Sequence, residues 1–167
     1  DGAGSIAVEG GRVGPVEPAA LSAGARVEVR DLFFATPARL KFLKQETTEK
    51  QHIAALVSRY ALAYPHIRFR LIQSGQEALR TSGNGSLHEV LGEVYGSEVA
   101  RQMLNIKPAE ELPMRPDLPP ITIDGFTSLP ALNRANRNHI TLFMNGRWIQ
   151  DTSISYAVIQ AYHTLLM

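Results

Sequence analysis

The beginning of the chain alternates apolar and polar residues in short runs, which is the pattern of half-buried strands. Residues 5–9 and 12–16 flank the turn Gly10-Gly11, and this arrangement predicts a hairpin. The alternation returns over residues 27–32 and predicts a third strand. Three strands are too few for a stable domain, so we expect them to join a sheet formed by an upstream part of a longer protein.

Residues 24–43, GARVEVRDLFFATPARLKFL, combine the third strand with a sharp turn and the start of a helix. Thr36 is a favourable N-cap, and Pro37 loses nothing at the first helical position because the backbone N–H there has no intrahelical partner. We therefore expect a helix that begins at Pro37. The residues expected to fix this turn and helix entry are Asp31, Thr36, Pro37 and Arg39.

A longer helix is predicted to begin at Thr47 or Thr48 and to end before Pro65. Its large apolar residues recur at the i, i+3, i+4, i+7 spacing of a core-facing stripe. This stripe consists of Ile53, Leu56, Val57, Tyr60 and Tyr64. The same spacing turns Lys50, Gln51 and Arg59 toward water.

The rest of the chain is predicted to mix short strands with two helices. We expect a hairpin over residues 67–81, a helix with a capping box at 86–89, a strand over 103–107, a proline-rich loop over 108–120 and a strand over 121–126. Strands over 140–144 and 147–149 flank the turn Asn145-Gly146, and Asp151, Thr152 or Ser153 caps a last helix. Strands before and between helices indicate an α+β fold with helices on one face of a mixed sheet.

Composition narrows the class of protein. The 167 residues are 44% hydrophobic and 20% charged, as in ordinary globular proteins, and no apolar run approaches the roughly 18 residues that cross a bilayer. The chain has no cysteine, which excludes disulfides and thiolate metal sites and suits a reducing cytoplasm. Because Asp1 is not an initiator Met and the last helical pattern runs into Met167, we expect an internal piece of a longer protein.

Hydrolytic and metal chemistry find little support in the sequence. No Gly-x-Ser-x-Gly elbow exists, and no histidine has a metal-ligand spacing such as His-Glu-x-x-His. Glu110-Glu111 is typical of a solvated pair in a loop. Residues 82–86, SGNGS, have the local form of a phosphate cradle before a helix, but they lack the lysine and the Walker spacing.

Basic residues gather at one place late in the chain. The 17 basic and 16 acidic residues give a net charge of +1, so contact with nucleic acid requires a local patch. Residues 133–139, NRANRNH, contain Arg134 and Arg137, and Arg147 follows across the next turn. Arginine and asparagine donate to phosphate oxygens, so these arginines are candidate contacts to a DNA backbone.

Two segments carry a resemblance to a known family. DLFFATPARLKFL at residues 31–43 and FMNGRWIQD at residues 143–151 resemble two motifs, in the same order, of the MutL family of DNA mismatch-repair proteins, which belong to the GHKL ATPases. The resemblance implies that residues 1–44 are the end of the GHKL ATPase-domain sheet. Residues 45–167 are then most of a transducer domain resembling ribosomal protein S5 domain 2. It gives Asn145, Gly146 and Asp151 structural roles.

The family resemblance also implies cofactors. The full-length protein is expected to bind ATP and Mg²⁺ through motifs that lie upstream of this segment, and through a lysine that lies beyond Met167. Gly24-Ala25 stands where the family has Gly-Thr, so the hydroxyl near the nucleotide is absent and Gly24 serves either the nucleotide site or a turn. We therefore expect no bound cofactor and no ATPase activity in this segment alone.

Partners follow from the same resemblance. We expect binding to DNA without sequence preference, dimerisation of the full-length protein, contact with the mismatch-recognition protein MutS, no membrane, and a cytoplasmic, nucleoid-associated location. An alternative is the transducer domain of another GHKL ATPase such as a gyrase B-type topoisomerase. A stand-alone S5-like RNA-binding domain is a third interpretation, which leaves the strands of residues 1–44 unpaired.

Overall fold

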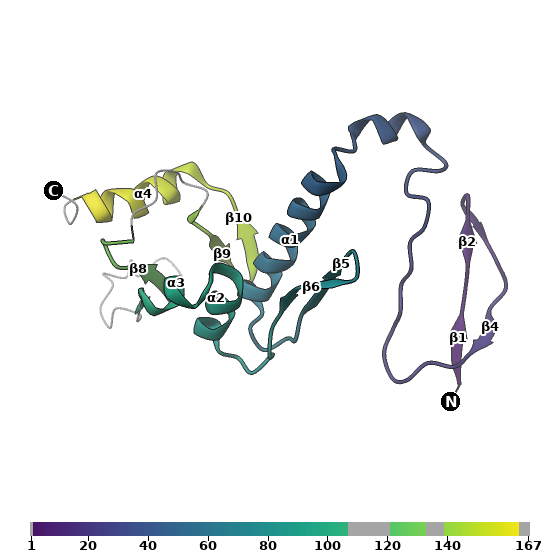
Figure 1. The fold of residues 1–167 in the computed structure, drawn as a ribbon, viewed down its shortest axis with the longest axis horizontal. Helices are drawn as coiled ribbons and strands as arrows, with labels where there is room; N and C mark the ends of the chain where they lie inside the picture. Colours follow the sequence, from purple (N-terminus) through teal and green to yellow (C-terminus); the bar gives the residue numbers. More distant parts are fainter. Residues whose placement is uncertain (1, 107–120, 133–138, 164–167) are drawn as a thin grey trace. The chain divides into compact units, whose positions relative to one another are not determined.

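A computed structural model describes residues 2–106, 121–132 and 139–163 (Figure 1). The chain divides into two compact units, Asp1–Glu49 and Lys50–Met167, and each unit is described by itself. Arg134 and Arg137 lie outside the described residues. No helix in the described ranges has both the length and the apolar character needed to cross a membrane.

The first unit contains the predicted hairpin. β2 (Val8–Glu9) and β3 (Arg12–Val13) pair antiparallel around Gly10 and Gly11, whose φ angles are 56° and 85°. Positive φ at both turn positions is the type I′ requirement that glycine meets without strain. A second antiparallel pair, β1 (Ala3–Ser5) with β4 (Glu17–Ala19), extends the same ribbon beyond the predicted ends.

The strand predicted over residues 27–32 is absent from the described structure. Val27 and Val29 are 87% and 73% exposed, and Arg30 pairs with Glu28 at 2.6 Å on the alternate side. A strand needs a neighbouring strand, because its backbone N–H and C=O groups form their hydrogen bonds with the backbone of that neighbour. The prediction of a strand over these residues was therefore wrong.

Two backbone hydrogen bonds form the turn before the first helix. The N–H of Phe34 donates to the carbonyl of Asp31 at 2.9 Å, and the N–H of Thr36 donates to that of Phe33 at 2.9 Å. Asp31 and Phe33 have φ angles of 46° and 70°, so this turn holds two non-glycine residues in the left-handed region.

The helix predicted at Pro37 forms as the 3₁₀ helix η1 (Pro37–Phe42). Thr36 occupies the N-cap position, but its side chain makes no capping hydrogen bond, so the predicted Thr36 cap is wrong. In the tighter 3₁₀ turn Thr36 takes part in a backbone hydrogen bond instead, in which the N–H of Arg39 donates to the carbonyl of Thr36 at 2.8 Å.

The long helix α1 (Glu46–Ala63) already contains Thr47 and Thr48, so the prediction that one of them caps it was wrong. Ala61 and Leu62 are buried, and Val57 packs against the core, whereas Ile53, Leu56 and Tyr60 are about half exposed. The predicted stripe is therefore displaced around the helix. Large apolar residues suggested one face, but the face that packs closely includes the small residue Ala61.

The next hairpin packs beside α1. β5 (Arg70–Gln73) and β6 (Gln76–Arg80) pair around Ser74-Gly75, and a bulge lies between Leu71 and Ile72. The amide of Gln73 donates to the carbonyl of Lys50 at 2.8 Å, and the Lys50 ammonium donates to the hydroxyl of Ser74 at 2.5 Å. These bonds fix the turn end of the hairpin to α1.

Two helices follow where one was predicted. α2 (Leu87–Tyr95) is capped by Ser86, whose hydroxyl accepts from the N–H of Glu89 at 3.2 Å, and Gly96 ends it with φ 91°. The short helix α3 (Ser97–Arg101) was not predicted. β7 (Met103–Ile106) forms as expected and pairs with β8 (Gly125–Ser128), which lies later than the predicted strand over 121–126.

The last elements are the hairpin of β9 (Leu142–Met144) and β10 (Arg147–Ile149), and the helix α4 (Thr152–His163). Asp151 is the cap among the three candidates, since its Oδ1 accepts from the N–H of Ile154 at 2.8 Å. The hydroxyl of Tyr162 donates to the carbonyl of Ser128 at 2.7 Å and also contacts the hydroxyl of Thr127. Tyr162 thereby ties α4 to β8.

The core of the second unit is small and lies between α1, β6, α2 and α3. Its buried apolar residues are Ala61, Leu62, Leu79, Val90, Leu91 and Ala100. The α+β class is confirmed. Within the described residues the strands pair as five two-stranded antiparallel sheets, whereas the sequence led us to expect one mixed sheet.

Candidate functional site

The β9–β10 turn fixes the position of Arg147. Asn145 and Gly146 have φ angles of 51° and 74°, the two positive values that a type I′ turn needs. The hydroxyl of Tyr64, just after α1, donates to the carbonyl of Gly146 at 3.1 Å. A Cβ on Gly146 would lie 3.2 Å from that hydroxyl oxygen, so glycine permits the close approach. The hairpin tip is therefore docked against the end of α1.

Arg59 meets the same hairpin one turn earlier along α1. Its guanidinium carbon lies 3.9 Å from the centroid of the Trp148 ring, which is cation–π geometry. Arg59 is half-buried, and Trp148 is 38% exposed. The expectation that Arg59 simply faces water was wrong, because the contact with Trp148 joins residues far apart in the chain.

Most other arginines of the second unit already have partners. Arg70 and Arg80 both pair with Glu77, at 2.6 and 3.7 Å, and Arg101 pairs with Glu98 at 2.6 Å. Arg68 donates from Nε to the carbonyl of Ser82 at 3.2 Å. Among the described arginines of Lys50–Met167, Arg59 and Arg147 have neither a hydrogen bond nor an ion pair, so their charge and donors are available to a ligand.

The sequence had selected Arg147 but not Arg59. Arg147 is the first residue of β10, is exposed, and lies opposite Met144 in the antiparallel register. Arg134 and Arg137 fall outside the described residues, so their proximity to Arg147 stays a prediction. No local sequence signal distinguishes Arg59, since its partner Trp148 lies in another element.

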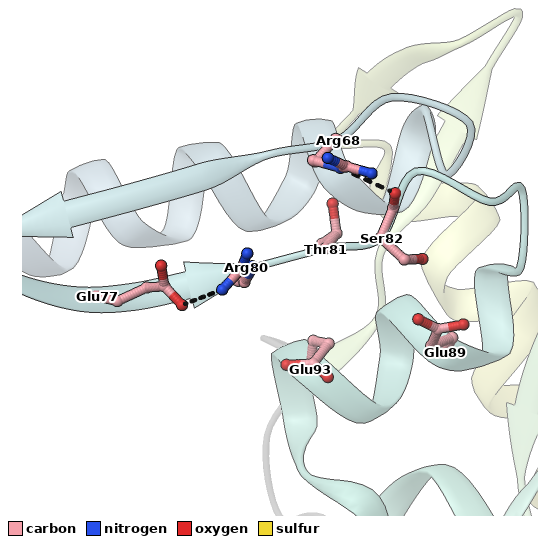
Figure 2. Close-up of a pocket in the computed structure, with 7 residues that line it drawn as sticks. All are labelled: Arg68, Glu77, Arg80, Thr81, Ser82, Glu89 and Glu93. Atoms are coloured by element: carbon pink, nitrogen blue, oxygen red, sulfur yellow. Dashed lines mark hydrogen bonds and ion pairs between the residues drawn. The ribbon is translucent and has the colours of Figure 1, made fainter.

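A hollow of about 410 Å³ lies beside β6 and α2 (Figure 2). Its polar lining residues are Arg68, Glu77, Arg80, Thr81, Ser82, Glu89 and Glu93. The buried hydroxyl of Thr81 accepts from the N–H of Phe69 at 2.9 Å and donates to the carbonyl of Ile67 at 3.3 Å. The lining mixes arginines with glutamates, and Arg80 is paired with Glu77. The hollow therefore has no surface of a single charge that would attract a charged ligand.

The sequence 82–86 does not form a phosphate cradle. The Asn84 amide donates to the Glu89 carboxylate at 2.5 Å, so an acidic group lies at the first turn of α2. Hydrogen bonds from the Asn84 amide and then from the Ser82 hydroxyl lower the pKa of Glu89 below its ordinary value. A carboxylate that is ionised at neutral pH repels a phosphate at this helix end.

The other residues that were selected from the sequence lie in turns or cap a helix. Gly24 has a φ of 132°, and a Cβ added there would meet no atom within 4 Å, which suits a turn. Asp151 caps α4 and Asn145-Gly146 forms the β9–β10 turn. In the described residues no group of three or more His, Asp or Glu side chains could hold a metal ion.

Comparison with known proteins finds relatives among DNA mismatch-repair proteins. Residues 91–167 match the family described as "DNA mismatch repair protein, C-terminal domain". DNA mismatch repair protein MutL of Shouchella clausii is 38% identical over 161 residues, which are 96% of this chain and 23% of the relative. MutL of Streptococcus pneumoniae strain CGSP14 is 42% identical over 162 residues, which are 97% and 24%. The chain thus spans about a quarter of the length of these curated relatives.

A solved structure agrees with the sequence matches. The chain superimposes on the Aquifex aeolicus MutL ATPase domain complexed with ADP, with a TM-score of 0.71 and 31% identity, over 93% of this chain and 56% of that one. The chain is therefore part of a DNA mismatch-repair protein. More narrowly, it belongs to the MutL family. The gyrase-type and stand-alone RNA-binding interpretations are set aside.

Proposed function

We propose that this segment joins the ATPase domain of a MutL-like protein to its transducer domain, and couples the nucleotide state to dimerisation and DNA binding. Residues 1–44 are the end of the ATPase domain in this proposal, and residues 45–167 belong to the transducer. The ATPase-domain match to a structure complexed with ADP supports it. ATP and Mg²⁺ are then held by parts of the ATPase domain outside this sequence.

Exposed apolar residues of the first unit support a larger domain around it. Val27, Val29, Phe34 and Phe42 are each at least 73% exposed. Burying one such side chain stabilises a protein by about 1.5–3 kcal/mol, so four exposed together are unfavourable in water. We propose that the remainder of the ATPase domain covers them, and that residues 27–32 become a strand beside it.

DNA binding through the second unit rests on one observation. Arg59 and Arg147, unlike the other described arginines of that unit, present guanidinium groups without a carboxylate or carbonyl partner. Such groups bind phosphate oxygens and read no base sequence. Arg134 and Arg137 extend the same proposal by their place in the sequence. This proposal requires that the full-length protein is cytoplasmic and nucleoid-associated, that it dimerises and that it binds MutS.

A salt titration of duplex binding by the full-length protein tests the DNA contacts. Each phosphate neutralised contributes about −0.9 to the slope of log K against log salt. Arg147→Gln should make the slope shallower by about 0.9, and reversal of Arg134 and Arg137 together to Glu by about two units. Affinities for unrelated sequences should fall alike.

Arg101→Gln is the matched control for this titration, because Arg101 is an exposed arginine whose charge is already paired with Glu98. Its slope should equal that of the wild type. Superimposable slopes for wild type, Arg147→Gln and the double reversal would remove this region from the DNA path.

A further inference from the structure

The Arg59–Trp148 contact differs in kind from the other arginine contacts of the second unit. At Arg70 and Arg101 a nitrogen lies 2.6 Å from a glutamate oxygen, so the carboxylate offsets the charge of the arginine and occupies an N–H donor. At Arg59 the partner is the face of an aromatic ring, 3.9 Å from the guanidinium carbon. A ring face attracts the cation without carrying a negative charge.

The contact with the ring leaves the charge of the guanidinium without a counter-charge. A guanidinium has five N–H donors, and those of Arg59 make no hydrogen bond or ion pair with the described residues. Arg59 can therefore be held in one orientation while its charge and donors stay free for phosphate. A carboxylate in place of Trp148 would also pair with the arginine, but its negative charge would offset that of the guanidinium.

The ring itself is held in place. Trp148 lies opposite Phe143 in the β9–β10 register, and Phe143 packs against the core of the second unit. The turn of the same hairpin is bonded to Tyr64 at the end of α1. The hairpin is thus attached near the helix that carries Arg59, which limits the freedom of both partners.

We propose that Trp148 is a positioning residue for DNA binding: it holds Arg59 over its ring so that the free guanidinium meets a backbone phosphate. This inference rests on the proposed function, since it requires that the second unit contact DNA. It assigns Trp148 no contact with the DNA itself.

Trp148→Leu in the full-length protein is the first test. Cation–π pairs at partly exposed sites correspond to about a two- to five-fold change in an equilibrium constant, so duplex affinity should fall by about that factor. The salt slope should stay that of the wild type, because Arg59 still reaches the phosphate part of the time. Trp148→Phe, which keeps a ring face, should recover most of the affinity.

A double-mutant cycle separates positioning from direct contact. Arg59→Gln should lower the affinity and make the salt slope shallower by about 0.9. In that background Trp148→Leu should have no further effect on affinity, because there is no cation left to position. Tyr156→Leu is the control, since Tyr156 is an exposed aromatic of α4 with no cation or ring contact among the described residues.

Each other result overturns the inference. If Trp148→Leu weakens binding equally with and without Arg59, then Trp148 contacts DNA or supports the fold, and a lowered melting temperature identifies the second case. If Arg59→Gln leaves binding unchanged while Arg147→Gln alters the slope, the inference fails but the proposed function stands. If the wild-type protein does not bind duplex DNA, both fail.

Discussion

Substitution of Gly146 by alanine tests whether the β9–β10 hairpin is docked on α1. The chain provides a matched control in the other hairpin turn, because Ser74-Gly75 and Asn145-Gly146 have nearly the same backbone, with φ of 50° and 78° against 51° and 74°. An added Cβ meets no atom within 4 Å at Gly75, but lies 3.2 Å from the Tyr64 hydroxyl oxygen at Gly146. The two substitutions therefore share the strain and differ in the contact.

The shared strain of alanine in the left-handed region is about 1–2 kcal/mol. At Gly146 the Tyr64 hydroxyl must also move and weaken its 3.1 Å bond to the Gly146 carbonyl, which adds about 0.5–1.5 kcal/mol. We expect Gly75→Ala to lower the free energy of unfolding by about 1.5 kcal/mol and Gly146→Ala by about 2.5 kcal/mol.

Urea unfolding of the full-length variants, followed in the transition of the second unit, measures both changes. Tyr64→Phe removes the hydroxyl that causes the extra contact, and in that background the two alanine substitutions should have nearly equal effects. Equal effects in the presence of Tyr64 would refute the docking of the hairpin against α1.

Further predictions concern caps, pH and activity. Asp151→Ala should lower the free energy of unfolding by about 1 kcal/mol in urea, and Asp151→Asn by only a few tenths, because the amide oxygen still caps α4. Thr36→Ala should change the free energy of unfolding by less than about 0.5 kcal/mol, since the Thr36 hydroxyl makes no capping hydrogen bond. A loss of about 1 kcal/mol would instead show that Thr36 caps the helix. The lowered pKa of Glu89 means that its stabilising effect is present above the ordinary value of 4.5 and is lost as pH falls through the folded pKa. Asn84→Ala should return that pKa toward 4.5 in an NMR titration. The isolated 167-residue chain should show no ATP turnover above a control without protein.

Features set by neighbours in the sequence were predictable. The turns Gly10-Gly11, Ser74-Gly75 and Asn145-Gly146 all form, because each depends on residues that tolerate positive φ. The Ser86 half of the predicted capping box also forms, since a hydroxyl three residues from a free N–H needs no distant partner. The other half does not form, because the N–H of Ser86 donates to Oδ1 of Asn84 and not to the Glu89 carboxylate.

Features set by distant partners were not predictable. The buried face of α1 includes Ala61 and Leu62 because α2 and β6 pack there, and hydrophobic periodicity cannot tell which face meets them. Residues 27–32 have the alternation of a strand, but a strand also needs a neighbour with which to exchange hydrogen bonds. In each case the local pattern was compatible with the outcome without deciding it.

The candidate DNA contacts likewise depend partly on sequence neighbours and partly on distant partners. Clustering in the sequence selected Arg134, Arg137 and Arg147 as a basic patch. Whether an arginine can bind phosphate depends equally on what else its guanidinium contacts, and the charge of Arg101 is offset by that of Glu98 three residues away. No carboxylate offsets the charge of Arg59, because the group that it contacts is the ring of Trp148, an arrangement that only the fold creates. The availability of a cation thus depends on the groups around it, and for Arg59 these include the ring of Trp148 in β10.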